Sequence, residues 1–167
     1  MNSATIASIV GIAFGCAWGV AGSTALPRQY QLSGVIMSIT ISILLIVGLL
    51  IHPGTHQQGR FDGRLYGFAV VFEVLAIAGT VFGLHRLNLQ AFLMPAIGFI
   101  VGLHFIGLWR ATELRVFLWI AVGMCGICVI ALFLPGRIAS DADVRNAVTG
   151  FGSALVLWTA ASLTLFR

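Results

Sequence analysis

Residues 65–84 read LYGFAVVFEVLAIAGTVFGL, a stretch whose one charged side chain is Glu73. A helix that crosses the hydrocarbon core of a bilayer needs about 20 predominantly apolar residues. Five similar runs accompany it, and none of the five contains Asp, Glu, Lys or Arg. The expected spans are residues 4–26, 33–51, 65–84, 89–109, 116–135 and 146–166. The sequence therefore predicts an all-α polytopic membrane protein, with six transmembrane helices in one compact bundle and a single domain over residues 1–167.

The composition indicates the same class. Of the 167 residues, 59% are hydrophobic and 8% are charged, and the mean hydropathy is +1.05. Soluble domains carry about 25% charged residues. The nine basic residues, all arginine, give a net charge of +4 and are spread over the connections and the C-terminus. Such spacing is typical of interface anchors rather than of a nucleic-acid-binding patch, so the expected partner is the lipid bilayer.

The arginines also carry a weak signal for orientation. An even number of spans puts both termini on one side of the membrane, and that side would hold Arg60, Arg64, Arg110, Arg115 and Arg167. The opposite side would hold Arg28, Arg86, Arg137 and Arg145. This small excess favours termini in the cytoplasm and a multi-pass location in the bacterial cytoplasmic (inner) membrane. A bias so small also permits insertion in both orientations.

Two residues mark expected helix starts. Asp143 comes just before the sixth run and is expected to cap its N-terminus. Pro95 falls in the first turns of the fourth run, where a missing backbone N–H matters least.

Glu73 is the first candidate for a functional residue. It lies eight residues after Leu65, which is about 12 Å along a helix and therefore near the middle of a bilayer. An ionisable group at that depth is costly, so it indicates a functional site by default. One stripe of the same helix holds only small or polar residues: Ala69, Glu73, Ala76, Thr80 and Gly83. We therefore expect Glu73 to face the interior of the bundle.

His104 is the second candidate. The third and fourth spans should form an antiparallel hairpin, which brings His104 to within roughly one turn of the depth of Glu73. The two side chains could then meet directly or through water, which would lower the cost of burying either group. Other polar residues reach similar depths or share the stripe, and the expected substrate or ion pathway comprises Glu73, His104, Ser42, Thr80 and Thr159, with Cys125 nearby. A purely structural hydrogen bond that locks two helices together is the alternative interpretation.

The first span carries a regular column of small residues, spaced four apart: Ala7, Gly11, Gly15, Gly19 and Ser23. Such columns let two helix backbones approach closely. The pattern predicts tight helix packing, either within the chain or against another subunit.

Motifs for metal or redox chemistry are weak. Cys125 and Cys128 form a C-x-x-C pair on one helix face, and the favoured interpretation is two small core residues. His52 and His56 have a metal-like spacing before Asp62, but Pro53 breaks the helix that would align them. We expect no metal, no cofactor and no enzymatic activity.

Residues 95–108 read PAIGFIVGLHFIGL. This segment resembles a recurring segment of small bacterial six-span membrane proteins of uncharacterised function, in which Gly-Leu-His-Phe, here Gly102 to Phe105, precedes a short apolar stretch. Such relatives often have Pro where Gly107 stands here. The resemblance implies that His104 is a family feature, and it implies no activity.

Two functions follow as hypotheses. The first is a small proton- or cation-linked transporter or channel in which Glu73 is the titratable site within the membrane. The second is a non-transporting scaffold or partner subunit, in which the small-residue column of the first span docks another membrane protein or a second copy.

Overall fold

The computed structural model describes residues 3–51, 62–136 and 142–165, and it is helical. The elements are α1 (Ser3–Ser23), α2 (Arg28–Ile51), α3 (Gly63–Arg86), the 3-10 helix η1 (Gln90–Phe92), α4 (Leu93–Thr112), α5 (Arg115–Leu132) and α6 (Val144–Leu165). Each helix occupies one of the six expected runs. The boundaries differ most at α2, which begins at Arg28 because Pro27, with its fixed φ, is suited to the start of a helix.

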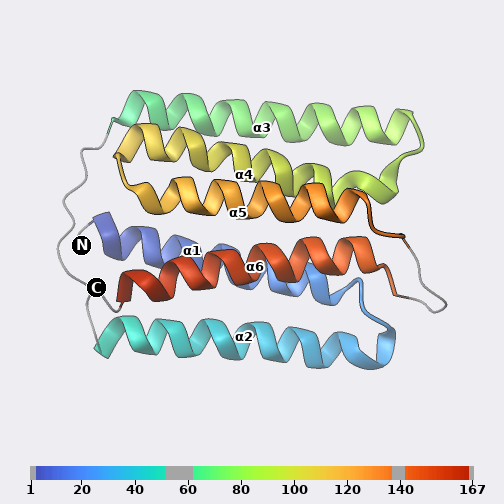
Figure 1. The fold of residues 1–167 in the computed structure, drawn as a ribbon, viewed down its shortest axis with the longest axis horizontal. Coiled ribbons are helices and arrows are strands. Elements are labelled where there is room, and N and C mark those ends of the chain that lie inside the picture. Colours follow the sequence, from blue (N-terminus) through green and yellow to red (C-terminus); the bar gives the residue numbers. More distant parts are fainter. Residues whose placement is uncertain (1–2, 52–61, 137–141, 166–167) are drawn as a thin grey trace.

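The helices lie roughly antiparallel in a bundle in which α2 and α3 occupy opposite edges (Figure 1). Helix α1 packs mainly against α6 and α2, and α4 packs mainly against α5 and α3. The apolar core is built from α1, α4, α5 and α6, around Phe105, Met124 and Leu157. Helix α3 makes its extensive contacts with α4 and η1, and it contains no fully buried residue.

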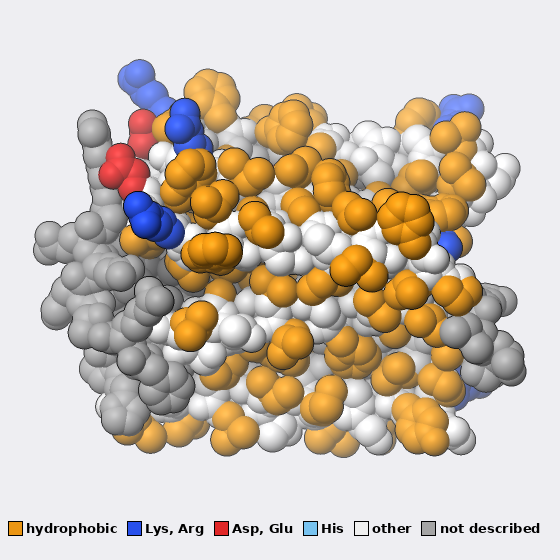
Figure 2. Space-filling view, viewed as in Figure 1, with side chains coloured by type: hydrophobic (Ala, Val, Ile, Leu, Met, Phe, Trp, Pro, Cys, Tyr) orange, Lys and Arg blue, Asp and Glu red, His pale blue; other side chains and the backbone are white. Residues whose placement is uncertain are grey.

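The outer surface of the bundle is strongly apolar. Large exposed hydrophobic side chains occur on every helix, for example Leu44, Phe72 and Trp119. They form a broad belt, with charged side chains gathered toward the two ends (Figure 2). Five helices, α2 to α6, are long and apolar enough to cross a membrane, and α1 contributes a shorter apolar helix over Ser8–Ser23. The fold is therefore compatible with a multi-pass membrane protein.

The first residues of α1 and the last residues of α6 lie at the same end of the bundle, as the even number of helices requires (Figure 1). Asp62 begins α3 at this end, where its Oδ1 accepts hydrogen bonds from the backbone N–H groups of Arg64 and Leu65. Its own N–H donates to the Ala111 carbonyl oxygen at 2.8 Å, which joins the start of α3 to the end of α4.

Arg145 joins three elements at the opposite end. Its Nη2 donates a hydrogen bond to the Leu134 carbonyl oxygen, just beyond α5, at 2.9 Å. Its guanidinium carbon lies 4.2 Å from the centre of the Phe92 ring in η1. The carboxylate of Asp143 accepts a hydrogen bond from the Asn146 backbone N–H at 3.1 Å, so Asp143 caps α6 as the sequence predicts.

The column of small residues on α1 faces other helices of the same chain. A Cβ added to Gly15 would lie 2.6 Å from the Trp158 indole of α6, and one added to Gly19 would lie 2.5 Å from the Ser38 hydroxyl of α2. Ser23 is fully buried and donates a hydrogen bond to the Gly19 carbonyl oxygen at 2.7 Å. These positions therefore have partners inside the chain, while the side chain of Ala7 lies outside the described part of the structure.

The same kind of contact holds α5 against α6. A Cβ added to Gly123 of α5 would lie 3.0 Å from Val156 of α6, and one added to Gly152 of α6 would lie 2.7 Å from Ile127 of α5. Each glycine thus receives a branched side chain of the opposite helix, which allows the two backbones to approach closely.

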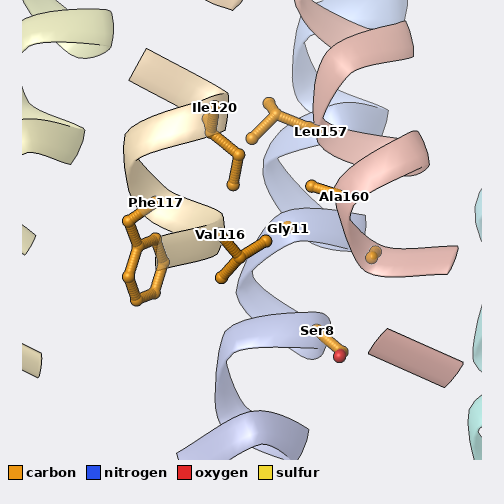
Figure 3. Close-up of a pocket in the computed structure, with 8 residues that line it drawn as sticks. Ser8, Gly11, Val116, Phe117, Ile120, Leu157 and Ala160 are labelled. Carbon is orange, nitrogen blue, oxygen red and sulfur yellow. The ribbon is translucent and has the colours of Figure 1, made fainter. Parts of the chain in front are cut away.

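One position of the column has spare room. A hollow of about 10 Å³ lies between α1, α5 and α6 (Figure 3), just large enough for one water molecule. Its lining residues are Ser8, Gly11, Val116, Phe117, Ile120, Leu157, Ala160 and Ala161. A Cβ added to Gly11 would lie 3.5 Å from the Leu157 carbonyl oxygen and 3.6 Å from the Ala161 Cβ, which are ordinary contact distances.

Gly15 and Gly11 should therefore respond in opposite ways to substitution by alanine. Gly15→Ala should lower the free energy of unfolding by about 1–3 kcal/mol, because the added methyl would overlap the Trp158 indole. Gly11→Ala should leave it unchanged or raise it by up to about 1 kcal/mol, because alanine favours the helix and the site has room. Thermal unfolding in detergent, followed by near-UV circular dichroism, measures both. Equal destabilisation by the two variants would contradict the packing described for α1.

Arg145→Met should destabilise the bundle by about 1–3 kcal/mol, because it removes a charge-assisted hydrogen bond to a helix end. Arg86→Met is a matched control, since Arg86 is exposed and its guanidinium lies 5.0 Å from Phe82 of its own helix. The same unfolding measurement should show little change for the control. A comparable loss in both variants would mean that Arg145 does not tie these elements together.

Candidate functional site

The structure brings Glu73 and His104 together across the α3–α4 hairpin. The Nδ1 atom of His104 lies 3.4 Å from Oε2 of Glu73 and 3.2 Å from the backbone carbonyl oxygen of Ala69. Ala69 is one helical turn before Glu73, so a single imidazole nitrogen faces two oxygen atoms of α3. The imidazole therefore contacts both the side chain and the backbone of the neighbouring helix.

The pair lies well inside the apolar length of both helices. Glu73 follows the start of α3 at Gly63 by ten residues, or about 15 Å at the helical rise. The side chains of His104 and Glu73 are only 10% and 18% exposed. Removing two ionisable side chains from water in an apolar region is costly unless each gains a polar partner. Here Glu73 and His104 are partners of each other.

The stripe of small and polar residues on α3 is the face that packs against α4. Ala69, Glu73, Ala76, Thr80 and Gly83 are all partly buried, whereas Phe68, Phe72, Leu75 and Phe82 are exposed. The orientation predicted from the stripe agrees with this burial pattern. The contact surface is the inner side of an outermost helix, however, and not the centre of the bundle, which α1, α4, α5 and α6 fill.

Gly107 sets how closely α3 and α4 approach. A Cβ added to Gly107 would lie 2.7 Å from the Ala69 Cβ, a distance that real side chains do not tolerate. Gly107 is one turn along α4 from His104, and Ala69 provides the carbonyl oxygen that His104 contacts. The missing side chain at Gly107 therefore permits the geometry of the candidate site.

The other residues expected on the pathway do not gather at this pair. Thr80 shares the α4-facing stripe of α3 but is seven residues, or about 10 Å, from Glu73. Ser42 is buried on α2, where its hydroxyl accepts a hydrogen bond from Trp158 Nε1 at 3.2 Å. Thr159 is exposed on α6. Since α2 and α3 lie at opposite edges, Ser42 is separated from Glu73 by the width of the bundle (Figure 1).

Thr159 belongs to a shallow groove between α2 and α6, with a volume of about 420 Å³. Its lining is mostly apolar and comprises Met37, Ile41, Leu45, Phe151, Leu155, Trp158, Thr159 and Ser162. Neither this groove nor the small hollow beside Gly11 includes Glu73 or His104.

The cysteine pair fills space against α4. A Cβ added to Gly98 would lie 2.7 Å from Cys128 Sγ, and one added to Gly102 would lie 2.7 Å from Cys125 Sγ. Both thiols are free. This packing agrees with the interpretation of the C-x-x-C pair as two small core residues.

Metal-ligand clusters are not found among the residues that the structure describes: no three His, Cys, Asp or Glu side chains lie together there. His52 and His56 fall in the stretch 52–61, outside the described ranges. Asp62, the third member of that motif, is the N-cap of α3.

Sequence reasoning missed two residues that shape these sites. The Trp158 indole packs over Gly15 and Gly19, where neither glycine has a side chain. Its Nε1 also donates a hydrogen bond to the Ser42 hydroxyl. The glycine spacing on α1 predicts a close contact, but it does not say which helix supplies the bulky side chain. The importance of Gly107 could have been predicted, because it is a glycine one turn from His104. It therefore lies on the same face of α4, which a hairpin would pack against α3.

The chain matches no protein-family model, no curated protein and no solved structure. The resemblance noted at Gly102 to Phe105 therefore stays a prediction, and the functional interpretation rests on the geometry of this chain alone.

Gly107→Ala should separate α3 from α4 and lower the free energy of unfolding by about 1–3 kcal/mol, because the added methyl would overlap the Ala69 Cβ. Gly79→Ala is the matched control on α3, since no atom lies within 4 Å of an added Cβ there. Thermal unfolding in detergent compares the two. A disulfide crosslink between cysteines introduced on α3 and α4 should also form more slowly in Gly107→Ala. Unchanged stability and crosslinking would contradict the role given to Gly107.

Proposed function

We propose that this chain is an integral membrane protein that acts as a small proton- or cation-linked transporter or channel, with Glu73 as its titratable site. The observation that carries the proposal is the contact of 3.4 Å between Glu73 Oε2 and His104 Nδ1, midway along two adjacent apolar helices. An acid and an imidazole in that position can gain and lose protons within the bilayer.

A purely structural role explains the pair less well. The α3–α4 contact already has close packing at Gly107 and Ala69, together with the hydrogen bond from Asp62 to Ala111 at the helix ends. Neither interaction requires an ionisable side chain in the apolar region. Apolar residues of similar volume can often stand in place of a buried ion pair without loss of stability, so the stability of the α3–α4 contact does not by itself call for this pair.

The position of α3 supports movement at the site. This helix contributes no fully buried residue, and its outer face carries exposed Phe68, Phe72 and Phe82. A change at the α3–α4 contact therefore needs little repacking of the core. Transport requires the site to become accessible from each side of the membrane in turn, and an outer helix that contacts chiefly α4 can move without opening the central core.

The packing of the small-residue column gives the scaffold alternative less support. Gly11, Gly15 and Gly19 contact α6 and α2 of the same chain and are buried. An enzyme is also disfavoured, because catalysis commonly needs several converging polar groups. Around Glu73 and His104, the described contacts add the Ala69 carbonyl oxygen alone.

The bilayer of the bacterial cytoplasmic membrane is the proposed setting, with both termini in the cytoplasm. The belt of exposed apolar side chains supports a lipid environment (Figure 2). The distribution of arginines in the sequence favours this orientation slightly.

Glu73→Gln should abolish transport by the full chain reconstituted in liposomes, because the amide keeps the shape of the side chain but cannot exchange a proton. A pH-sensitive dye inside the vesicles measures proton flux after an imposed pH step, with valinomycin and potassium to clamp the voltage. Sodium and potassium fluxes are measured in parallel. Glu113→Gln is the matched control, since Glu113 is exposed at the α4–α5 turn.

The proposal predicts flux in the wild type and in Glu113→Gln, and background leak in Glu73→Gln. Flux in Glu73→Gln equal to that of the wild type would show that this carboxylate does not carry the mechanism. The melting temperature of each variant in detergent separates loss of function from loss of fold.

A further inference from the structure

We infer that His104 and Glu73 form a directed proton relay, in which the proton enters at Nε2 of His104 and leaves Nδ1 for the Glu73 carboxylate. This inference rests on the proposed function and narrows its cargo to protons. It is carried by the position of the Ala69 carbonyl oxygen, which assigns the two imidazole nitrogens different roles.

The Ala69 contact fixes which nitrogen carries hydrogen. A carbonyl oxygen can only accept a hydrogen bond. A hydrogen bond between His104 Nδ1 and the Ala69 oxygen, which lie 3.2 Å apart, therefore requires the tautomer with hydrogen on Nδ1. In the neutral imidazole the lone pair is then on Nε2, on the opposite edge of the ring. Glu73 Oε2 lies 3.4 Å from the same Nδ1, as an ion-pair contact.

This arrangement determines the proton step. In the proposed step, a proton that reaches the site binds the lone pair of Nε2 and makes an imidazolium ion. The Nδ1–H bond then breaks, its electron pair stays on the ring, and its proton forms a bond to Glu73 Oε2. The contact must first shorten toward about 2.7–2.9 Å, the usual length of a charge-assisted hydrogen bond. The products are an imidazole protonated on Nε2 and a neutral carboxylic acid.

The transfer also weakens the contact between the helices. After the step, the bare Nδ1 faces the Ala69 carbonyl oxygen, and two lone pairs oppose each other where a hydrogen bond had been. Proton arrival at Glu73 is thereby coupled to loss of one of the interactions that hold α3 on α4. This coupling supplies a reason for the outer helix to move when the acid becomes neutral.

The same geometry disfavours a metal ion as cargo. An ion held between Glu73 and His104 would need the lone pair of Nδ1, and the proposed tautomer places hydrogen there. An ion on Nε2 would need further ligands, and no three His, Cys, Asp or Glu side chains gather within the described ranges. A proton requires only the two groups present.

The described contacts of Glu73 and His104 include no other charged side chain. The charged or titratable side chains of α3, α4, α5 and their caps near the helix ends are Asp62, Arg64, Tyr66, His85, Arg86, Arg110, Glu113 and Arg115. The thiols Cys125 and Cys128 of α5 face Gly102 and Gly98 of α4. The described residues of η1 carry no charge.

The tautomer is tested directly by nuclear magnetic resonance on the full chain in lipid bilayers, with ¹⁵N-labelled histidine. The signal of His104 is assigned by its absence in His104→Asn. The expected result at neutral pH is hydrogen on Nδ1 and a bare Nε2. Hydrogen found on Nε2, with Nδ1 bare, would overturn the relay whatever the transport measurements show.

The relay itself is tested by proton flux in His104→Asn liposomes. Asparagine places an N–H group near the position of Nδ1, so it can keep the hydrogen bond to Ala69 but cannot take up a proton. Flux should fall by at least about tenfold, given that positioned proton-transfer groups contribute about 10²–10⁴-fold, while the melting temperature is kept.

The outcomes separate the two proposals. Loss of flux in Glu73→Gln with wild-type flux in His104→Asn would refute the relay and leave the proposed function standing. Glu73-dependent flux of sodium or potassium without proton flux would do the same. Wild-type flux in Glu73→Gln would remove both.

Discussion

Close approach of helix backbones at glycine is the constraint on which the rest of this structure depends. Lipid tails are as apolar as leucine, so hydrophobic burial gives little reason for two helices to associate inside a bilayer. Van der Waals contact must supply it instead, and it does so where a side chain fills the space above a glycine. Trp158 above Gly15, Cys128 above Gly98 and Ile127 above Gly152 repeat this contact at three different helix interfaces.

The candidate site is a product of the same packing. His104 reaches the backbone of α3 because Gly107 lets Ala69 come close, and Glu73 lies one turn from Ala69. A backbone carbonyl oxygen, which no sequence motif records, is the acceptor on which the proposed hydrogen position depends. The chemistry proposed for the acid thus follows from a steric feature of the neighbouring helix.

The sequence was sufficient to predict the six helices and the proximity of one side-chain pair, Glu73 and His104. Apolar length places all six helices, and the hairpin between α3 and α4 puts Glu73 and His104 at similar depth. Depth along a helix is readable because the rise per residue is fixed, but lateral position is not. Ser42 and Thr159 have suitable depths, yet Ser42 lies on α2, at the far edge of the bundle from α3, and Thr159 is exposed beside α2. Which helices become neighbours depends on how Trp158 and the glycines fit together in three dimensions.

The absence of fully buried residues from α3 has an evolutionary consequence. The core around Met124 and Leu157 is assembled by other helices, so substitutions on the exposed outer face of α3 should disturb the fold little. Selection can then alter the surroundings of the acid separately from the residues that keep the protein folded. If the proposed function holds, such a division would let one scaffold change its specificity through a single segment, as loops do on the rigid frameworks of many water-soluble proteins.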